Sequence, residues 1–442
     1  MDVLGERMAK ATEKLEADFS KVDTKISRFP HVMRGIGGHG SYIAPIVAAI
    51  LGQDQDGSLK TEGVKLAAAY NLCRRNNSAA QDVYGKVLSV VGAARDCYDA
   101  DDPTVVGVSD ADFATIMFVD GCFLVQYMVV VGVSDTDEDR VLHNPMIRRQ
   151  ILSMGASIQK DVFLLENQIP WLVLDAIVAE LVPAVDVRGF VHMMGAMFVQ
   201  TRRTGLGGGN GNVLDHYKPP HLLGLLRSTL VGCMPHQVML NFRYHGSTTT
   251  GSVQSLMSAT YLNEIGVILT PSTEPRFGDM SFGRLPVNAR LFLSPVFLNH
   301  VTACCLVNMA ALEAMMSTEE EASNESAGGS VVTSYLSVLT MLMDGMEDVQ
   351  ELRRKGLLQG PMSDMQALVF FKALRRHLRF GVRHMLILEE IQSYCRHKSV
   401  RIAVQRFTYR NFYGTAAAII SITNVVSSIC TVLQTFKNGS NK

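Results

Sequence analysis

The residues best placed to do chemistry are polar side chains set inside apolar runs. Asp120 stands within VDGCFL, and Glu166 begins the polar island of VFLLENQIPWLVLDAIV, residues 162–178. A buried carboxylate is costly unless it is paired, so Asp120 must face water, cap a backbone, or meet a cation such as Arg148 or Arg149. One hypothesis is therefore an acidic enzyme site, of unknown class, that gathers Asp120, Glu166 and histidines in a cleft.

The same polar island also suits a structural role at a junction between two helices. Asn167 is expected to cap the second helix, which places Pro170 in its first turn, where a missing N–H costs nothing. Glu166 and Gln168 are expected to satisfy exposed backbone groups at the join, and Trp171 to anchor the corner in the core. On this hypothesis the stretch is a structural hinge and not a catalytic centre.

Other motifs that could bind a cofactor or a metal ion fail on spacing. GLGGGNG has Asn210 where a dinucleotide loop needs its third glycine, and no GxxxxGK[ST] occurs. DTDED is followed by Arg140 and Met146 where a calcium loop needs glycine and glutamate. His377 and His384 share a predicted helical face but lack a third ligand nearby in the sequence. We therefore predict no cofactor, no metal ion and no catalytic residue.

Composition and charge narrow the class of protein. Of 442 residues, 47% are hydrophobic and 19% are charged, which indicates a large core, a membrane segment, or both. A net charge of −1 argues against nucleic acid as a partner of the whole chain. Eight cysteines without a CxxC pair are typical of free thiols in a reducing compartment.

The C-terminal part of the chain is strongly basic. Residues 372–410 hold ten Lys/Arg against two acidic residues. One predicted helix in this part carries four arginines on a single face, which is either a membrane-proximal basic face or a solvated one: Arg375, Arg376, Arg379 and Arg383.

A long uncharged run follows this basic part. Residues 414–436 contain no charge and are long enough to cross a bilayer. Because the basic residues precede the run, a single-pass membrane protein with its body on the cytoplasmic side is expected, in a membrane that the sequence does not identify. The alternative is that the run forms a buried core helix.

Apolar periodicity predicts a mainly α-helical, bundle-like body. Helices are expected over residues 59–75, 110–132, 144–168, 170–182, 219–232, 302–318, 331–345, 348–358 and 367–395. Short alternating runs between residues 261 and 297 predict one or two short strands. The predicted fold class is therefore mainly α, with a minor β element and one C-terminal transmembrane helix.

The chain is expected to form one body with flanking segments. These are an N-terminal amphipathic helix over residues 1–25, the helical body over 26–411, a transmembrane helix over 412–436 and a short tail over 437–442. Within the body, Gly-rich and Ser/Glu-rich stretches predict loops at residues 204–212 and 317–330.

Motifs along nearly the whole chain fit one known pattern. Its opening is matched by Ile26, Phe29-Pro30, Arg34, Tyr42, Pro45, Leu59, Glu62 and Lys65. The most specific motifs are VDGCFL, LLENQIPW and HLLGLLR, followed by YLNEIGVIL, TSYL, DVQELRRKG and the aromatic YRNFYG before the last run. Together they resemble the plant family catalogued as domain of unknown function 247. The S-I-G-P-Y-H element of that family is replaced here by AAILGQDQDG.

The resemblance implies a mostly helical, membrane-associated plant protein without an established enzymatic activity. Some similar proteins of grasses are pollen-side recognition determinants in self-incompatibility, which comes to this chain only by analogy. The leading hypothesis is a non-enzymatic, membrane-anchored protein that recognises an unknown protein partner. The alternatives are the enzyme with a site near Asp120 and Glu166, and a soluble helical scaffold whose last helix is buried.

Overall fold

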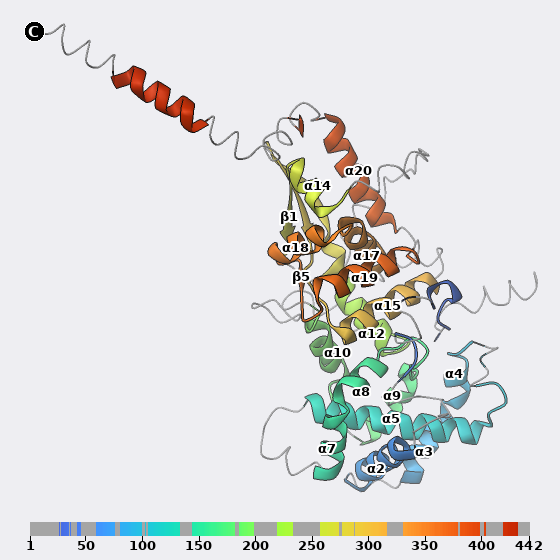
Figure 1. Cartoon of the computed structure of the whole chain (residues 1–442). Coiled ribbons are helices and arrows are strands. Elements are labelled where there is room, and N and C mark those ends of the chain that lie inside the picture. Colours follow the sequence, from blue (N-terminus) through green and yellow to red (C-terminus); the bar gives the residue numbers. More distant parts are fainter. Residues whose placement is uncertain are drawn as a thin grey trace, which may run out of the picture.

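The computed structural model describes most of the predicted body and part of the last helix (Figure 1). The described residues are 26, 28–34, 36, 42–45, 59–75, 80–99, 102, 105–132, 144–181, 185–198, 219–232, 257–273, 276–286, 288–315, 330–378, 381–397, 402–403 and 419–431. The predicted N-terminal helix, the loop at 204–212, the loop at 317–330 except its last residue, and the tail lie outside this set.

The described residues are mainly helical, as predicted. The helices are α2 (Leu59–Arg75), α3 (Ala80–Ser89), α4 (Val91–Arg95), α5 (Asp110–Gly132), α7 (Pro145–Ser153), α8 (Gly155–Asp161), α9 (Trp171–Leu181), α10 (Val187–Ala196), α12 (Leu222–Val231), α14 (Ala259–Glu264), α15 (His300–Met315), α17 (Val331–Leu342), α18 (Met346–Arg354), α19 (Asp364–Arg375) and α20 (Val382–His397). Two short 3-10 turns are η2 (His31–Met33) and η4 (Phe277–Asp279).

Two small sheets complete the described part of the fold. Four of their strands lie between residues 261 and 297, where one or two short strands were predicted, so the region was right and the number too low. The strands are β1 (Val267–Pro271), β2 (Ser281–Arg284), β3 (Ala289–Leu293), β4 (Val296–Phe297) and β5 (Leu358–Gln359). In the first sheet β3 is central, parallel to β1 and antiparallel to β2. In the second, β4 runs parallel to β5. Phe282 of β2 meets Tyr394 of α20 edge to face, so α20 packs on the first sheet.

Helix α5 forms the centre of one half of the body. It contacts α2, α3 and α9, which surround it (Figure 1). Among the described residues it is the one helix long and apolar enough to cross a membrane, but most of that apolar stretch is buried inside the protein. A helix covered by neighbouring helices belongs to a protein core, so α5 fits a core helix rather than a membrane span.

The other half is built around α12, α15 and α17, whose buried faces meet. Arg227 of α12 donates to Glu313 of α15, with 2.9 Å between Nε and Oε1. The same carboxylate accepts from the backbone N–H groups of Val332 and Thr333 at the start of α17. Glu313 therefore joins three helices and satisfies N–H groups that a helix leaves unpaired in its first turn.

Several predicted helices are shorter or more broken than expected. The helix predicted over 144–168 is two helices, α7 and α8, and the chain leaves α8 after Asp161. The helix predicted over 348–358 ends at Arg354, and Leu358 enters β5. Periodicity did not reveal these ends because the apolar spacing continues through them.

The helix predicted over 367–395 is also wrong, because α19 and α20 are separate helices. Gly381 lies against the start of α17, where a Cβ would be 2.7 Å from the carbonyl oxygen of Ser330. The chain must leave the axis of α19 to make this close approach. The single face predicted for the four arginines therefore does not form.

The four arginines have different surroundings. Arg375 and Arg376 are exposed at the end of α19. Arg383 belongs to α20, is partly buried, and donates to the carbonyl oxygen of Gly278. Arg379 lies outside the described residues.

Two glycines near β5 provide a test of backbone constraint. Both have positive φ, 73° at Gly356 and 109° at Gly360. A Cβ at Gly356 would meet nothing within 4 Å, whereas one at Gly360 would overlap the backbone of Leu298. We expect Gly356→Ala to destabilise the protein by about 1 kcal/mol through strain alone, and Gly360→Ala by a further 1–3 kcal/mol, roughly, through overpacking.

Urea unfolding of the two variants followed by circular dichroism measures this difference. Gly356→Ala is the matched control, because it changes the same residue type at a positive φ without a clash. Equal losses of stability in the two variants would show that the contact with Leu298 imposes no constraint.

Candidate functional site

The LLENQIPW stretch links α8 to α9 and is held by hydrogen bonds to distant segments. Glu166 accepts from the backbone N–H of Phe29 at 2.8 Å and pairs with the guanidinium of Arg34. These two residues belong to a segment that we call the N-terminal strap, residues 28–34. Glu166 therefore fastens the strap to the junction between α8 and α9.

Asn167 closes the end of α8 and does not cap α9, so the predicted cap is wrong. It is 3% exposed, and its Nδ2 donates to the carbonyl oxygen of Asp161, the last residue of α8, at 2.9 Å. Such a bond satisfies one of the carbonyl groups that a helix leaves unpaired at its C-terminus.

Gln168 uses both ends of its amide to join α12 to the junction. Its Nε2 donates to the carbonyl oxygens of Leu164 and Val162 at 2.6 and 2.9 Å. Its Oε1 accepts from the backbone N–H of Leu223 in the first turn of α12 at 3.0 Å. Its own carbonyl accepts from the hydroxyl of Tyr98 at 2.8 Å. The Gln168 side chain thus binds backbone groups at the junction, as the sequence suggested.

Pro170 and Trp171 mark the start of α9. Trp171 is its first residue, and the carbonyl of Pro170 accepts from the N–H of Val173 at 3.0 Å. Pro170 therefore precedes the helix instead of lying in its first turn. The N–H of Trp171 donates to the carbonyl of Pro220 at 2.8 Å, and its half-buried indole lies 5.6 Å from the guanidinium carbon of Arg188.

Asp120 is paired with a buried lysine of α2. Its Oδ1 lies 2.8 Å from Nζ of Lys65, and the two side chains are 7% and 4% exposed. Nζ of Lys65 also lies 2.9 Å from the half-exposed carboxylate of Glu62. Arg148 and Arg149, the partners suggested by the sequence, are exposed on α7.

The environment of Lys65 favours its charged form. Burial lowers the pKa of Lys65, but the charges of Asp120 and Glu62 and the hydrogen bonds to them outweigh burial, so its pKa is raised. Catalytic lysines act as nucleophiles when their pKa is lowered. Lys65 therefore has the properties of an ion-pair partner rather than of a nucleophile.

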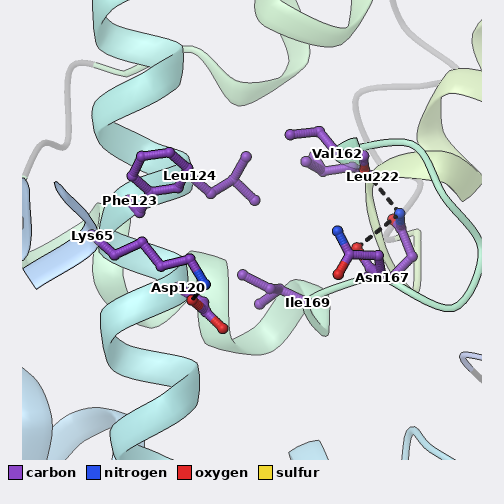
Figure 2. Close-up of a pocket in the computed structure, with 9 residues that line it drawn as sticks. Lys65, Asp120, Phe123, Leu124, Val162, Asn167, Ile169 and Leu222 are labelled. Carbon is purple, nitrogen blue, oxygen red and sulfur yellow. Dashed lines mark hydrogen bonds and ion pairs between the residues drawn. The ribbon is translucent and has the colours of Figure 1, made fainter. Parts of the chain in front are cut away.

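A small cavity lies between this ion pair and the junction (Figure 2). Its volume is about 20 Å³, which is room for about one water molecule. Figure 2 shows Lys65 and Asp120 on one side, Asn167 on the other, and Ile169 between them. The other lining residues are Phe123, Leu124, Val162, Gln168 and Leu222. The cavity suits one ordered water among polar groups more than a substrate.

The structure does not bring Asp120 and Glu166 into one cleft. Glu166 does not line the cavity, and the two carboxylates pair with different cations, Lys65 and Arg34. Within the described ranges, no group of three or more His, Cys, Asp or Glu side chains is placed to hold a metal ion. The hypothesis of an acidic site built on these two residues therefore has no geometric support.

The histidine of HLLGLLR has a structural position. His221 is fully buried, and its Nδ1 accepts from the N–H of Gly224 at 3.2 Å, which caps α12. Burial lowers the pKa of His221 to about 3, so the ring is neutral. His384 is also buried, and burial lowers its pKa to about 4. Neither histidine lines the cavity.

Several connecting residues were not assigned a connecting role from the sequence, although Lys65 and Asp348 stand in motifs that carry the family resemblance. Besides Lys65 and Glu313, Asp348 joins α18 to α14, because its Oδ1 accepts from the N–H and the hydroxyl of Thr260 at 2.9 and 2.7 Å. Its Oδ2 accepts from the N–H of Gly345 at 2.9 Å. For Glu313 the available signal was an acidic residue within an otherwise apolar helix, the same signal that drew attention to Asp120. Helix α18 is rich in charged residues, so this signal was absent for Asp348.

Comparison with known proteins places the chain in a family. The family model described as plant protein of unknown function, DUF247, matches residues 26–430. The chain belongs to the DUF247 family. A UPF0481 protein of Arabidopsis thaliana is 25% identical over 288 residues, which cover 61% of this chain and 56% of that protein. The match thus spans little more than half of the relative's length. No solved structure matches the chain.

The DUF247 motifs recognised in the sequence meet in space. The opening pattern supplies the strap that binds Glu166 of LLENQIPW. Lys65 of the next motif pairs with Asp120 of VDGCFL. In HLLGLLR, the backbone N–H of Leu223 donates to Gln168, and the side chain of Arg227 donates to Glu313. The motifs therefore supply the contacts that connect distant segments of the fold.

The ion pair of α2 and α5 can be tested with a double-mutant cycle. Lys65→Met or Asp120→Leu alone should destabilise the protein by about 3–5 kcal/mol, because the remaining charge loses its buried partner. The double variant Lys65→Met/Asp120→Leu should lose less than either single variant, since no charge stays buried. Chemical denaturation measures all three.

The exposed pair of Lys86 and Glu180 is the control for this cycle. Their side chains are 58% and 27% exposed, so Lys86→Met should cost less than about 1 kcal/mol. A loss at Lys65 as small as that at Lys86 would contradict the role assigned to the buried pair.

The strap gives a second prediction. Glu166→Ala removes the acceptor of the Phe29 N–H and the partner of Arg34, so local opening of the strap should become easier by about 1–3 kcal/mol. Limited trypsin digestion followed by mass spectrometry should then cut the strap roughly 5- to 100-fold faster. Asp102→Asn is the control, because it weakens only the long contact of 3.4 Å with Arg28 and leaves both arginines of the strap as cleavage sites. Similar digestion of the two variants would mean that Glu166 does not fasten the strap.

Proposed function

We propose that this DUF247 protein is a membrane-anchored recognition protein without catalytic activity, held at the membrane by the helix over residues 419–431 and its uncharged flanks. The observation that carries the proposal is the exposure of this helix. Every one of its residues is exposed. Its large apolar side chains are 52–63% exposed: Ile419, Ile420, Ile422, Val425, Val426 and Ile429. In Figure 1 the helix stands apart from the body.

Exposed apolar side chains of this kind favour insertion into lipid. Full burial of one Val or Ile side chain is worth about 1.5–3 kcal/mol, and six lie on this one helix. The helix of 13 residues covers about 20 Å, less than the bilayer core of about 30 Å. The uncharged run of residues 414–436 supplies enough chain for the remainder. The alternative of a last helix packed in the core receives no support from the exposed residues 419–431.

The charges before the helix favour a cytoplasmic body. Arg401, Arg406 and Arg410 precede the uncharged run, and basic residues flanking a span tend to remain on the cytoplasmic side. The body then faces the cytoplasm, in agreement with buried thiols at Cys73, Cys122, Cys304 and Cys305 that form no disulfide.

A non-catalytic role is supported by the use of the polar motif residues. Glu166, Asn167 and Gln168 bind backbone groups, and Asp120 binds Lys65. Recognition of a protein partner is the class of function that remains for such a body, and it is the role implied by the resemblance to self-incompatibility proteins of grasses. The partner is expected to bind exposed surfaces and loops of the body.

The anchor is testable by alkaline carbonate extraction of the tagged full-length chain expressed in plant cells. The wild-type chain should stay in the membrane pellet. The variant Ile422→Asp/Val425→Asp should appear in the supernatant, because each aspartate adds about 3 kcal/mol to the cost of insertion. The control Leu66→Asp/Tyr70→Asp changes two exposed apolar residues of α2 and should stay in the pellet. Release of the wild-type chain would refute the anchor.

A further inference from the structure

The outward face of α19 combines apolar and basic side chains. Met365 and Val369 are 55% and 59% exposed, and Lys372 and Arg376 continue at the same spacing. Steps of four, three and four residues at 100° per residue keep all four within about 60° of one another. Arg375 flanks this line and is exposed. We call these five residues the α19 stripe.

The other face of α19 is committed to the core. Its buried residues are Ala367, Leu368, Phe370, Phe371 and Leu374. The helix is fixed at its start by a capping box, in which Ser363 and Gln366 bind one another's backbone N–H groups. The α19 stripe is therefore presented on a rigid, docked helix.

Acidic residues close to the stripe already have partners. Asp364, at the start of α19, pairs with Arg353 at 2.6 Å. Glu351 of the neighbouring α18 pairs with Arg354 at 2.6 Å and lies 3.8 Å from Lys355. The acidic residue of α19 is therefore neutralised, and the charges that this helix and its C-cap expose on the stripe are positive.

We propose that the α19 stripe is a second membrane contact that binds anionic lipid headgroups through Lys372, Arg375 and Arg376, with Met365 and Val369 entering the headgroup region. A helix face with apolar and basic residues is the type that lies in a membrane interface. Each basic residue near an anionic surface strengthens binding about five-fold. This inference rests on the proposed anchor, which brings the body to the bilayer.

The chain between α20 and the anchor allows this contact. Fifteen residues separate the described residues Ala403 and Ile419, and an extended chain of this length reaches about 50 Å. These residues include Arg406 and Arg410 and no acidic residue, so they are attracted to the same anionic surface. The charge of the stripe and the proximity of a bilayer together favour lipid over an acidic protein segment as its occupant.

The test uses the full-length chain carrying Ile422→Asp/Val425→Asp, so that insertion of the anchor does not mask weaker binding. Co-sedimentation is measured with phosphatidylcholine vesicles and with vesicles that also contain phosphatidylserine. We expect binding only to the anionic vesicles. The further changes Lys372→Gln/Arg375→Gln/Arg376→Gln should weaken this binding by up to about 100-fold.

A matched control separates a local contact from net charge. The changes Arg74→Gln/Arg148→Gln/Arg149→Gln remove the same charge from exposed positions of α2 and α7, at the end of the body opposite α20 (Figure 1). This control should bind like its parent, whereas Met365→Ser/Val369→Ser should bind more weakly than the parent. Circular dichroism checks that every variant is folded.

Four results would overturn the proposal: equal weakening in the control, binding that does not depend on phosphatidylserine, retention of binding by the α19 variants, or no binding of the parent to either vesicle. The third result would place the lipid contact elsewhere on the chain, and the fourth would point to an acidic protein segment as the occupant of the stripe. Release of the wild-type chain by carbonate would refute the proposed anchor. The vesicle assay would still measure binding through the α19 stripe, because its parent variant does not use the anchor, so the failures of the two proposals are distinguishable.

Discussion

The fold depends on the polar junction that follows α8. Gln168 is 2% exposed, and its amide binds two carbonyl groups on one side and the first turn of α12 on the other. A hydrogen bond made in this way contributes only about 1 kcal/mol, but an unpaired buried amide costs about 1–3 kcal/mol. The junction therefore selects one arrangement of α8, α9 and α12 by penalising the others. Glu166 adds the N-terminal strap to the same point.

Buried ion pairs extend this principle to the helices. Lys65 with Asp120 and Arg227 with Glu313 each join helices that are distant in the sequence. A buried pair is weak evidence for stability, because removing two charges from water offsets most of their attraction. Its effect on specificity is clearer, since a shifted α2 would separate Lys65 from Asp120 and leave Lys65 only the half-exposed carboxylate of Glu62 on its own helix. Asn71 and Gln126, at 3.2 Å, repeat the same parallel register six residues, about 1.7 turns, further along α2 and α5.

The sequence predicted helices with one continuous apolar stripe and missed their interruptions. The bounds of α2 and α5 agree with the prediction, and α9 differs from it by one residue at each end. The break between α19 and α20 depends on the close approach of Gly381 to α17. The spacing of apolar residues along one helix carries no information about such a contact with another helix. In the candidate site, a partner for Asp120 was required by the cost of burial, but Lys65 lies 55 positions earlier and nothing local identifies it. The junction residues were recognised as structural, while the cap assigned to Asn167 was wrong because α9 begins only at Trp171 and the Asn167 amide binds the end of α8 instead.

The distribution of polar groups also bears on where function can lie. The motif residues that could have done chemistry are engaged with backbone groups or with opposite charges inside the body, and the cavity beside them has room for about one water. An active site needs polar groups that remain open to a ligand. Asp120, Glu166 and Gln168 are instead each engaged with another group of the protein. Recognition, by contrast, needs only surface features that a folded body holds in place. The exposed apolar helix over residues 419–431 and the exposed basic residues of α19 are features of that kind. A membrane would bury the apolar side chains and place anionic headgroups beside the basic ones. On the proposed function, the interior fixes the geometry in which these two surface features meet a membrane.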